Sequence, residues 1–411
     1  MTGIRSLTPP GQPRLLSPQP PRGEDLASYL ATGGYPTAPG PEHLLERVAT
    51  AGLRGRGGAG FPTAVKLRTL RDAPGDTVVV ANGEEGEPGS VKDRWLLRHR
   101  PHTVLDGLRL AAMTTGAVRG YVYLSDPHAA DAVRRALSER PPAVPVDIVP
   151  TEHAYVAGEE SAVVRRIDGG PALPTAKPPR PFERGVGGAP TLVANVETLA
   201  RLALLTAHPG AAGAVASGHL LTLSGGPEPS VLVEAPAGTL LKTLADHADR
   251  SGSAAVLLGG LFGGLYGDGW ADLRLDHDEL AAAGGALGCG AIHFLPPGDC
   301  PVGAAADAAG YLAAQSARQC GVCVSGTQAL AGTLAALSRG DGSEEDTERL
   351  RRWSLGLTGR GACGLLDAAA HVAATLLRHF PERVGAHQDA PCPSCADAPS
   401  HDGSRLTVTV P

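Results

Sequence analysis

In its first half the chain alternates short apolar segments with amphipathic ones, and this alternation limits most strongly the folds open to it. Residues 77–81, 120–126 and 144–150 are apolar, β-branched runs that predict strands. Residues 101–117 and 129–140 carry apolar side chains at helical spacing. Strands that alternate with helices pair in parallel, so this part of the chain predicts an α/β layer with a mainly parallel sheet.

The rest of the chain predicts two further units. After a change of composition near residue 212, GHLLTLSGG, PSVLVEAPAG and AAVLLGG indicate strands of a small β-rich domain. From Val302 to about Phe380 four helical segments with short connections indicate a helix bundle. We therefore expect a disordered Pro-rich tail at 1–25, an α/β domain at 26–211, a β-rich domain at 212–300, a helical domain at 301–385 and a flexible Cys-containing tail at 386–411.

Charge and hydropathy exclude two classes of partner. The net charge is −6 and no basic stripe is present, which argues against nucleic-acid binding. No run approaches the roughly 20 apolar residues of a membrane span. The N-terminus lacks the apolar stretch of a signal peptide, so we expect a cytoplasmic protein.

A glycine-rich segment follows the predicted helix at 41–53. Gly55-x-Gly57-x-x-Gly60 has the spacing of a dinucleotide fingerprint, but a helix precedes it where a Rossmann turn requires a strand. Glycines still let backbone N–H groups approach an anion, and Arg54, Arg56 and Lys66 add positive charge. An anion site and a flexible interdomain turn both fit this pattern.

Carboxylates gather in two places. Asn82-Gly83-Glu84-Glu85-Gly86-Glu87 follows the strand at 77–81, and open α/β sheets bind ligands at the carboxyl ends of their strands. A second pair, Glu159 and Glu160, follows Gly158 and opens a helix, where backbone donors stabilise negative charge. Asn195 and Thr198 are expected to supply further polar contacts. A solvated acidic turn is the alternative for each carboxylate group.

Seven cysteines make a simple disulfide scheme unattractive. Cys320 and Cys323 form one Cys-x-x-Cys pair, and Cys392 and Cys395 form another. In a reducing compartment such pairs indicate metal or redox chemistry more often than structural disulfides.

Taken together, five motifs resemble a known family. GLRGRGGAGFPTAVKL, ANGEEGEPGSVKDRWLL, YVAGEESAVVRRIDGG, AKPPRP and NVETLA follow one another as they do in the NADH-oxidising flavoprotein subunit of respiratory complex I and in related formate and hydrogen dehydrogenase subunits. The resemblance runs from about residue 41 to residue 385. It implies an α/β flavin-binding domain, then a small β-grasp-like (ubiquitin-like, soluble-ligand-binding) domain, then a helical iron–sulfur domain.

The resemblance also implies site residues. It assigns the catalytic contacts to the nicotinamide nucleotide to Glu87 and Glu160. It assigns cofactor binding to Gly55, Gly57, Gly58, Phe61, Lys66, Asn82, Glu84, Glu85, Gly158, Glu159, Asn195 and Thr198. Iron–sulfur ligation falls to Cys320, Cys323 and Cys363.

The chain departs from the family pattern at both sites. Gly326 stands where the family has its third cluster cysteine, so the fourth ligand is expected from Cys392 or Cys395 in the tail, or from Cys289. An iron-free bundle with leftover cysteines is the alternative. Near the nucleotide, Thr69 and Arg180 replace two aromatic rings of the family, which leaves Phe61 to stack. Arg180 is expected to stack as a cation or to meet a phosphate.

The implied activity is electron transfer from NADH to FMN, then to a 4Fe–4S cluster, then to an external acceptor. An iron–sulfur or ferredoxin protein is the expected partner, and electron flow from reduced ferredoxin in the reverse direction is a variant. The alternative is a family-derived binding scaffold, or an electron-transfer subunit, that has lost NADH oxidation, with or without loss of the cluster.

Overall fold

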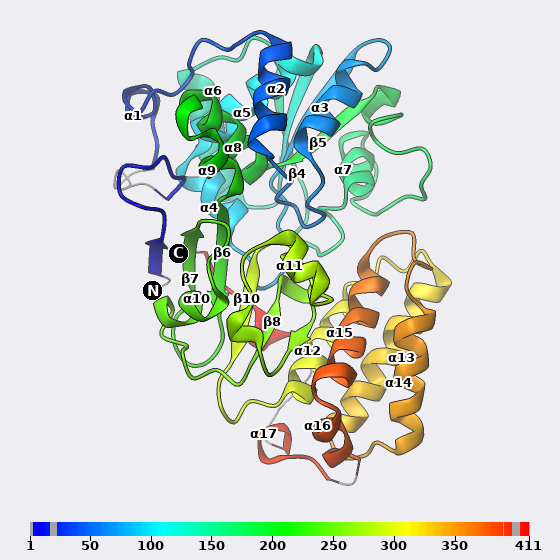
Figure 1. The fold of residues 1–411 in the computed structure, drawn as a ribbon. Helices are drawn as coiled ribbons and strands as arrows, with labels where there is room; N and C mark the ends of the chain where they lie inside the picture. Colours follow the sequence, from blue (N-terminus) through cyan, green and yellow to red (C-terminus); the bar gives the residue numbers. More distant parts are fainter. Residues whose placement is uncertain (1–2, 17–22, 389, 397–402, 411) are drawn as a thin grey trace.

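The computed structural model describes residues 3–16, 23–388, 390–396 and 403–410 (Figure 1). Its first sheet has four strands in the order β4-β3-β2-β5, all parallel. They are β2 (Thr77–Asn82), β3 (Ala117–Leu124), β4 (Val146–Pro150) and β5 (Thr191–Asn195). The prediction of a parallel α/β layer is confirmed, and β5 is a further strand that was not predicted.

Helices cover both faces of this sheet, and side chains alternate between the two faces along each strand. Along β2, Val79 and Ala81 join the larger apolar core, whereas Val78 and Val80 join the smaller one. The elements that contribute to the larger core include α2 (Pro41–Ala51), α3 (Thr63–Arg71), α4 (Lys92–His99), α5 (Pro101–Thr115), α6 (Pro127–Glu139), α8 (Val196–Ala207) and α9 (Ala212–Ser217). On the opposite face lies α7 (Glu160–Ile167), which contributes Val163.

The contact between α5 and α8 depends on one glycine. A Cβ atom at Gly107 would lie 1.9 Å from the carbonyl oxygen of Leu199. Only glycine permits this approach of two helix backbones. The start of α8 lies beside the end of β2 because Asn195, the N-cap residue of α8, pairs with Asn82.

The second sheet is mixed and has the strand order β1-β7-β6-β10-β8-β9. Its strands are β1 (Gly3–Ser6), β6 (His219–Ser224), β7 (Val231–Ala235), β8 (Ala255–Leu258), β9 (Leu265–Tyr266) and β10 (Ala291–Leu295). The three strands predicted after residue 212 are β6, β7 and β8. Two short helices, α10 (Leu241–His247) and α11 (His277–Ala282), pack against this sheet with Leu244 and Leu280 in its apolar core.

The expectation that residues 1–25 are disordered is wrong for the described part of that segment. Strand β1 pairs in parallel with β7, and Leu15 and Leu16 are buried in the main core. Leu16 N–H also donates to the Glu234 carboxylate at 2.8 Å. The high proline content led to the prediction of disorder. A segment that cannot form its own core is nevertheless held here by an edge strand and two buried leucines.

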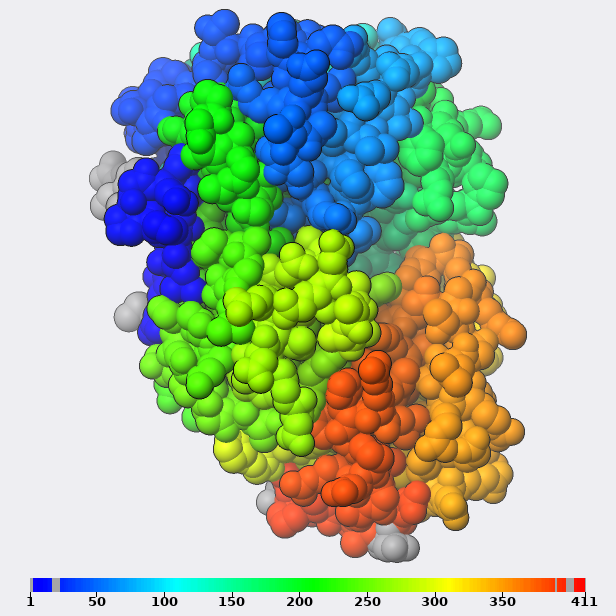
Figure 2. Space-filling view, viewed as in Figure 1, coloured from blue at the N-terminus to red at the C-terminus, as the bar shows by residue number. Residues whose placement is uncertain are grey.

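Four long helices occur where helical segments were predicted. They are α12 (Pro301–Ala314), α13 (Gly321–Ser338), α14 (Glu344–Gly356) and α15 (Leu365–His379), and they share one apolar core. Figure 2 shows this orange and red region packed beside the yellow-green segments of the second sheet, where Leu265 N–H donates to Thr375 Oγ1 at 3.0 Å. By length and composition α13 is apolar enough to cross a membrane, but it packs within this core.

The C-terminal segment is also ordered where it is described, contrary to the expectation of a flexible tail. Two short helices, α16 (Pro381–Ala386) and α17 (Pro393–Ala396), precede a 3-10 turn at Ser404–Leu406. Leu406 and Val408 are buried, and Val408 N–H donates to the Pro88 carbonyl at 2.9 Å. The end of the chain therefore returns to the acidic loop after β2.

Candidate functional site

A cavity of about 760 Å³ opens at the carboxyl ends of β2 and β5. Its lining includes ten of the predicted site residues: Gly55, Gly57, Phe61, Lys66, Asn82, Gly158, Glu159, Glu160, Asn195 and Thr198. Thr69 and Arg180 line it too. Of the lining residues that were not predicted, Lys177 carries a charge and Phe182 an aromatic ring. The five segments that the motifs marked thus meet at one place.

The glycine loop forms one wall of the cavity. Gly55 N–H donates to the Phe61 carbonyl and Thr63 N–H donates to the Leu53 carbonyl, each at 2.9 Å, so the loop is closed like a hairpin. Gly58 has φ +117°, a conformation that residues with a side chain rarely adopt. Phe61 remains 46% exposed, which leaves an aromatic face free at the cavity. The loop leads directly into α3, where Lys66 lies.

Charged side chains of both signs face one another across the cavity. Lys66 Nζ lies 3.9 Å from the Glu160 carboxylate, and Lys177 Nζ lies 3.4 Å from it. Glu159 caps α7, accepts from Ser161 N–H at 2.9 Å and pairs with Lys177. Burial lowers the pKa of Lys66, and Glu160 offsets only part of this effect. A partly desolvated ammonium with one distant carboxylate is suited to receive an anionic ligand.

The neutral polar residues of the lining hold the loops together. Asn82 Nδ2 donates to the Gly158 carbonyl at 2.9 Å, which ties the end of β2 to the turn before α7. Asn195 Nδ2 donates to Asp93 at 2.7 Å, and Thr198 Oγ1 accepts from Arg56 N–H at 2.9 Å. These bonds fix the glycine loop and α4 against the start of α8.

Four predicted residues lie outside this cavity lining: Gly58, Glu84, Glu85 and Glu87. Glu85 is buried and accepts from Asp93 N–H at 3.1 Å and Arg94 N–H at 3.2 Å at the start of α4. Glu84 is buried against His153, with 3.1 Å between carboxylate and Nδ1. The sequence could not distinguish Glu84 and Glu85, which lie outside the cavity lining, from Glu159 and Glu160, which line it, because all four are acidic residues in glycine-containing turns.

Glu87 was predicted to contact the nicotinamide nucleotide, but it lies outside the cavity lining, half-buried against the turn that follows β8. Its carboxylate accepts from Leu261 N–H at 3.2 Å, and a Cβ atom on Gly260 would lie 2.6 Å from it. Burial raises the pKa of Glu87 to about 8, although the backbone N–H groups of Leu261 and Gly89 partly oppose this shift. The carboxyl group therefore keeps its proton at neutral pH.

Glu87 should make folding stability depend on pH. Between its ordinary pKa of 4.5 and its folded pKa of about 8, only the unfolded state releases the proton. The free energy of unfolding should therefore fall as the pH rises between these two values, by roughly 1.4 kcal/mol per pH unit. Glu87→Gln should remove this slope between pH 5.5 and 8 in urea unfolding. Glu46→Gln, on an exposed face of α2, is the matched control; equal slopes in wild type and Glu87→Gln would contradict the assignment.

Arg56 is not available to an anion in the cavity, contrary to expectation. Its guanidinium is buried, lies 3.8 Å from the Glu197 carboxylate and donates to the Gly218 carbonyl at 2.9 Å. Glu197 also pairs with Lys92 at 3.2 Å and with Arg201 at 2.9 Å. This buried ionic cluster lies behind the glycine loop and supports it.

A second predicted site lies among the helices. Cys320, Cys323 and Cys363 line a small pocket of about 20 Å³ between the start of α13 and the loop before α15. The absent third cysteine leaves no gap at position 326, because a Cβ atom there would meet Leu366 and Leu357 at 3.0 and 3.1 Å. Three thiols are therefore gathered around one pocket.

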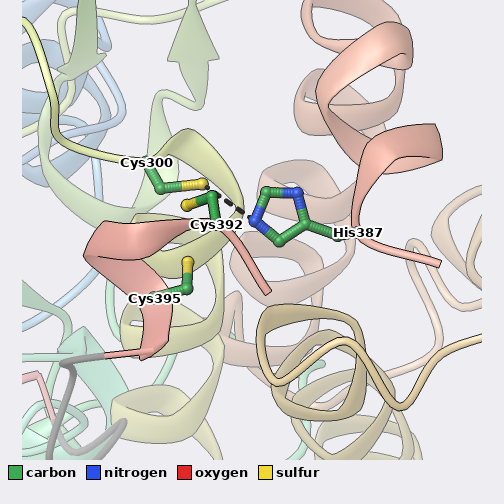
Figure 3. A group of neighbouring side chains, drawn as sticks. All are labelled: Cys300, His387, Cys392 and Cys395. Carbon is green, nitrogen blue, oxygen red and sulfur yellow. Dashed lines mark hydrogen bonds between the residues drawn. The ribbon is translucent and has the colours of Figure 1, made fainter. Parts of the chain in front are cut away.

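None of the three cysteines considered as a fourth ligand lines this pocket in the described structure. Cys392 and Cys395 lie instead with Cys300 and His387 at the far end of α12 (Figure 3). Cys289 Sγ lies 4.0 Å from the Gly259 carbonyl, beside the second sheet. The expectation that the tail completes the cluster is thus not supported by where its cysteines lie.

A glycine-walled cavity at the edge of a parallel sheet, together with a cysteine pocket in a helical region, defines a class of cofactor-dependent electron-transfer oxidoreductases. Family comparison gives the same class. Residues 48–204 match the Nuo51 FMN-binding domain, and residues 303–387 match the NADH-ubiquinone oxidoreductase-F iron–sulfur binding region.

Full-length relatives extend this match. The NADH-quinone oxidoreductase F 2 subunit of Rhizobium meliloti (strain 1021) is 32% identical, and the alignment covers 91% of this chain and 97% of that protein. The HndC subunit of the NADP-reducing hydrogenase of Solidesulfovibrio fructosivorans is 28% identical, over 90% and 82%. A crystal structure of an NAD⁺-reducing NiFe-hydrogenase in the air-oxidized state is similar with a TM-score of 0.78 and 31% identity, over 94% of this chain and 70% of that one.

The chain therefore belongs to the family of NADH-quinone oxidoreductase F subunits, and it is an NADH-linked electron-transfer oxidoreductase with FMN-binding and 4Fe–4S-binding regions. Its mixed α/β fold with parallel strands is that of the hydrogenase chain.

Proposed function

We propose that the cavity at the ends of β2 and β5 binds FMN and admits NADH beside it. The observation that carries this proposal is the cavity itself. It has room for a flavin nucleotide, glycines and Lys66 stand on one wall, and it lies within the residues that match the FMN-binding family model. FMN, when bound, links a two-electron donor to one-electron carriers.

The chain's own groups then have distinct tasks. Lys66 and the backbone of the glycine loop attract the phosphate. Asn82, Asn195 and Thr198 hold the surrounding loops in register. Glu160 offers acceptor oxygens to the nucleotide, and the exposed ring of Phe61 offers a stacking face, with Arg180 available to a second phosphate or ring.

The three thiols of Cys320, Cys323 and Cys363 hold the 4Fe–4S cluster, with Gly326 in place of one family ligand. Their number fits three corners of a cluster, and three cysteines line one small pocket within the region matched by the iron–sulfur family model. The fourth iron atom of the cluster takes a ligand other than the cysteine that the family has at position 326.

The chain is best divided at the predicted boundaries into an FMN domain, a small β-grasp-like domain and a four-helix iron–sulfur bundle. Each of the three units has an apolar core made mainly of its own residues, which supports this division, although second-sheet residues such as Leu220 and Leu257 also join the neighbouring cores. We further expect a cytoplasmic protein that passes electrons to an iron–sulfur or ferredoxin partner. The named relatives are subunits of larger assemblies, which supports a protein partner.

Anaerobic reconstitution tests the proposal. The full chain is incubated with FMN, iron and sulfide, freed of excess, and flavin, iron and sulfide are measured per chain. One flavin per chain and bleaching of its absorbance by NADH are expected. Bound flavin that NADH does not reduce would point to another electron donor, and protein with neither flavin nor iron would favour the scaffold function.

A further inference from the structure

Four potential metal ligands meet at the end of the helical region that lies away from the FMN cavity (Figure 3). Cys300 precedes α12, His387 follows α16, Cys392 precedes α17 and Cys395 lies within α17. Their ligand atoms all lie within 4.8 Å of one another, and Cys300, Cys395 and His387 are buried. Two segments that are distant in the sequence, the residue before α12 and the stretch from His387 to Cys395, thus supply one compact donor set.

The histidine is oriented as a ligand. His387 Nδ1 lies 2.7 Å from the Arg383 carbonyl, so this nitrogen carries the proton and donates it. Nε2 then presents its lone pair toward the cysteines, 3.4 Å from Cys300 Sγ. A backbone carbonyl that fixes the tautomer in this way is the usual outer partner of a metal-bound histidine.

The protein around the sulfur atoms favours negative charge and close packing. Cys300 is the N-cap residue of the fourteen-residue helix α12, where the positive end of the helix dipole stabilises negative charge on its sulfur. A Cβ atom on Gly303 would lie 3.2 Å from Cys395 Sγ, so the missing side chain brings α17 close to α12.

The spacing selects a single ion. Four ligands around one tetrahedral zinc, with Zn–S bonds of about 2.3 Å, lie roughly 3.8 Å apart. A four-iron cluster would instead require each ligand to reach a different iron atom. Three cysteines and one histidine are a common ligand set for structural zinc, and Cys392-x-x-Cys395 has the usual short spacing.

We propose that Cys300, His387, Cys392 and Cys395 bind one Zn²⁺ in a closed structural site, separate from the iron–sulfur site. All four positions of the ion are filled by protein, so it does no chemistry on a substrate. It fastens the segment after α16 to the start of α12. From there the chain continues to Leu406 and Val408, which pack beside the acidic loop.

Metal content separates the two sites. The full chain, reconstituted with iron, sulfide and FMN and supplied with zinc, should hold one zinc per chain in addition to its iron. In C392S/C395S zinc should fall to background while iron is kept. In C320S/C363S iron should fall while zinc is kept. Ser394→Ala, between the two tail cysteines, is the matched control and should keep both metals.

Cobalt provides a readout that does not depend on whether the variants fold well. Co²⁺ exchanged into the wild-type chain should give the intense visible bands of a tetrahedral ion and thiolate-to-cobalt charge transfer. Zinc should abolish these bands stoichiometrically. The inference would be overturned by wild-type protein that takes up neither ion, by iron in place of zinc at these four residues, or by zinc loss in C320S/C363S but not in C392S/C395S.

Discussion

Glu197→Ala is expected to destabilise the folded protein by about 3–5 kcal/mol, the usual cost of breaking a buried ion pair. The Glu197 side chain is 1% exposed and is surrounded by Lys92, Arg201 and Arg56. It also accepts from Leu220 N–H at 3.0 Å. Its removal leaves cationic groups in a space that water does not reach, with too few carboxylates to balance them.

The ionisation of Glu197 supports this expectation. Burial alone would raise the pKa of its carboxyl group, yet the charges of Lys92, Arg201 and Arg56 hold it below the ordinary value of 4.5. The carboxylate is therefore charged in the folded protein at neutral pH. Glu197→Gln keeps the size and the acceptor oxygen but not the charge, so it should be destabilising by a smaller amount.

Urea unfolding at neutral pH measures the effect. Glu42→Ala is the control, because Glu42 forms a salt bridge with Arg71 but is 66% exposed, and exposed pairs contribute about 0–1 kcal/mol. A loss below about 1 kcal/mol in Glu197→Ala would mean that the buried cluster is not needed for stability.

Gly57→Asp is expected to weaken FMN binding by at least about 100-fold, roughly 3 kcal/mol. The aspartate would add a negative charge to the wall on which we place the phosphate. Two like charges about 4 Å apart at a protein surface repel by about 4 kcal/mol. The glycine itself is not required by the backbone, since Gly57 does not adopt a positive φ.

Gly57→Ala separates the charge from the added bulk. A Cβ atom at this position would lie 3.4 Å from the Asn195 Cβ atom, close but without a clash. We expect the alanine variant to bind FMN within a few-fold of wild type. Gly58→Asp would be less informative, because φ of +117° strains any side chain there whatever its charge. Fluorescence quenching of FMN on titration with protein gives the affinities of wild type, Gly57→Asp and Gly57→Ala. Equal affinity of the two variants would mean that the phosphate does not bind beside Gly57.

Elements with local signals were predictable from sequence. The helix α14 begins where Ser343 and Asp346 form a capping box, and both residues can be read directly from the chain. The strand β2 is a run of valines between polar turns, as expected for a strand buried on both faces. The glycine loop and the carboxylate turns were recognisable because their residues are adjacent in sequence.

Elements stabilised by distant partners were not predictable. The helix α4 begins with Lys92 and Asp93, which suggest an exposed turn. Both are buried, because Glu197 in α8 pairs with Lys92 and Asn195 at the end of β5 donates to Asp93. Arg56 was predicted to attract an anion because its actual partner, Glu197, lies far along the chain and could not be recognised from the sequence.

The cysteines show this limit most clearly. Two Cys-x-x-Cys pairs indicated metal chemistry, but the sequence could not tell that each pair belongs to a different site. Nothing in the sequence around Cys300 indicated a metal ligand, because the nearest of the other three residues in the group, His387, lies far along the chain. Only the return of the chain past α16 brings them together.

The pairing of β1 with β7 sets an order on maturation. The strand β1 has no partner until residues 231–235 have been made, by which time the whole FMN-binding region has been synthesised. Domains generally fold as they are synthesised, from the N-terminus onward. The flavin pocket can therefore take shape while the leading segment is still loose, and that segment is secured only afterwards. A bulky fusion placed directly before Gly3 would burden this late docking step, whereas the pocket would already have formed.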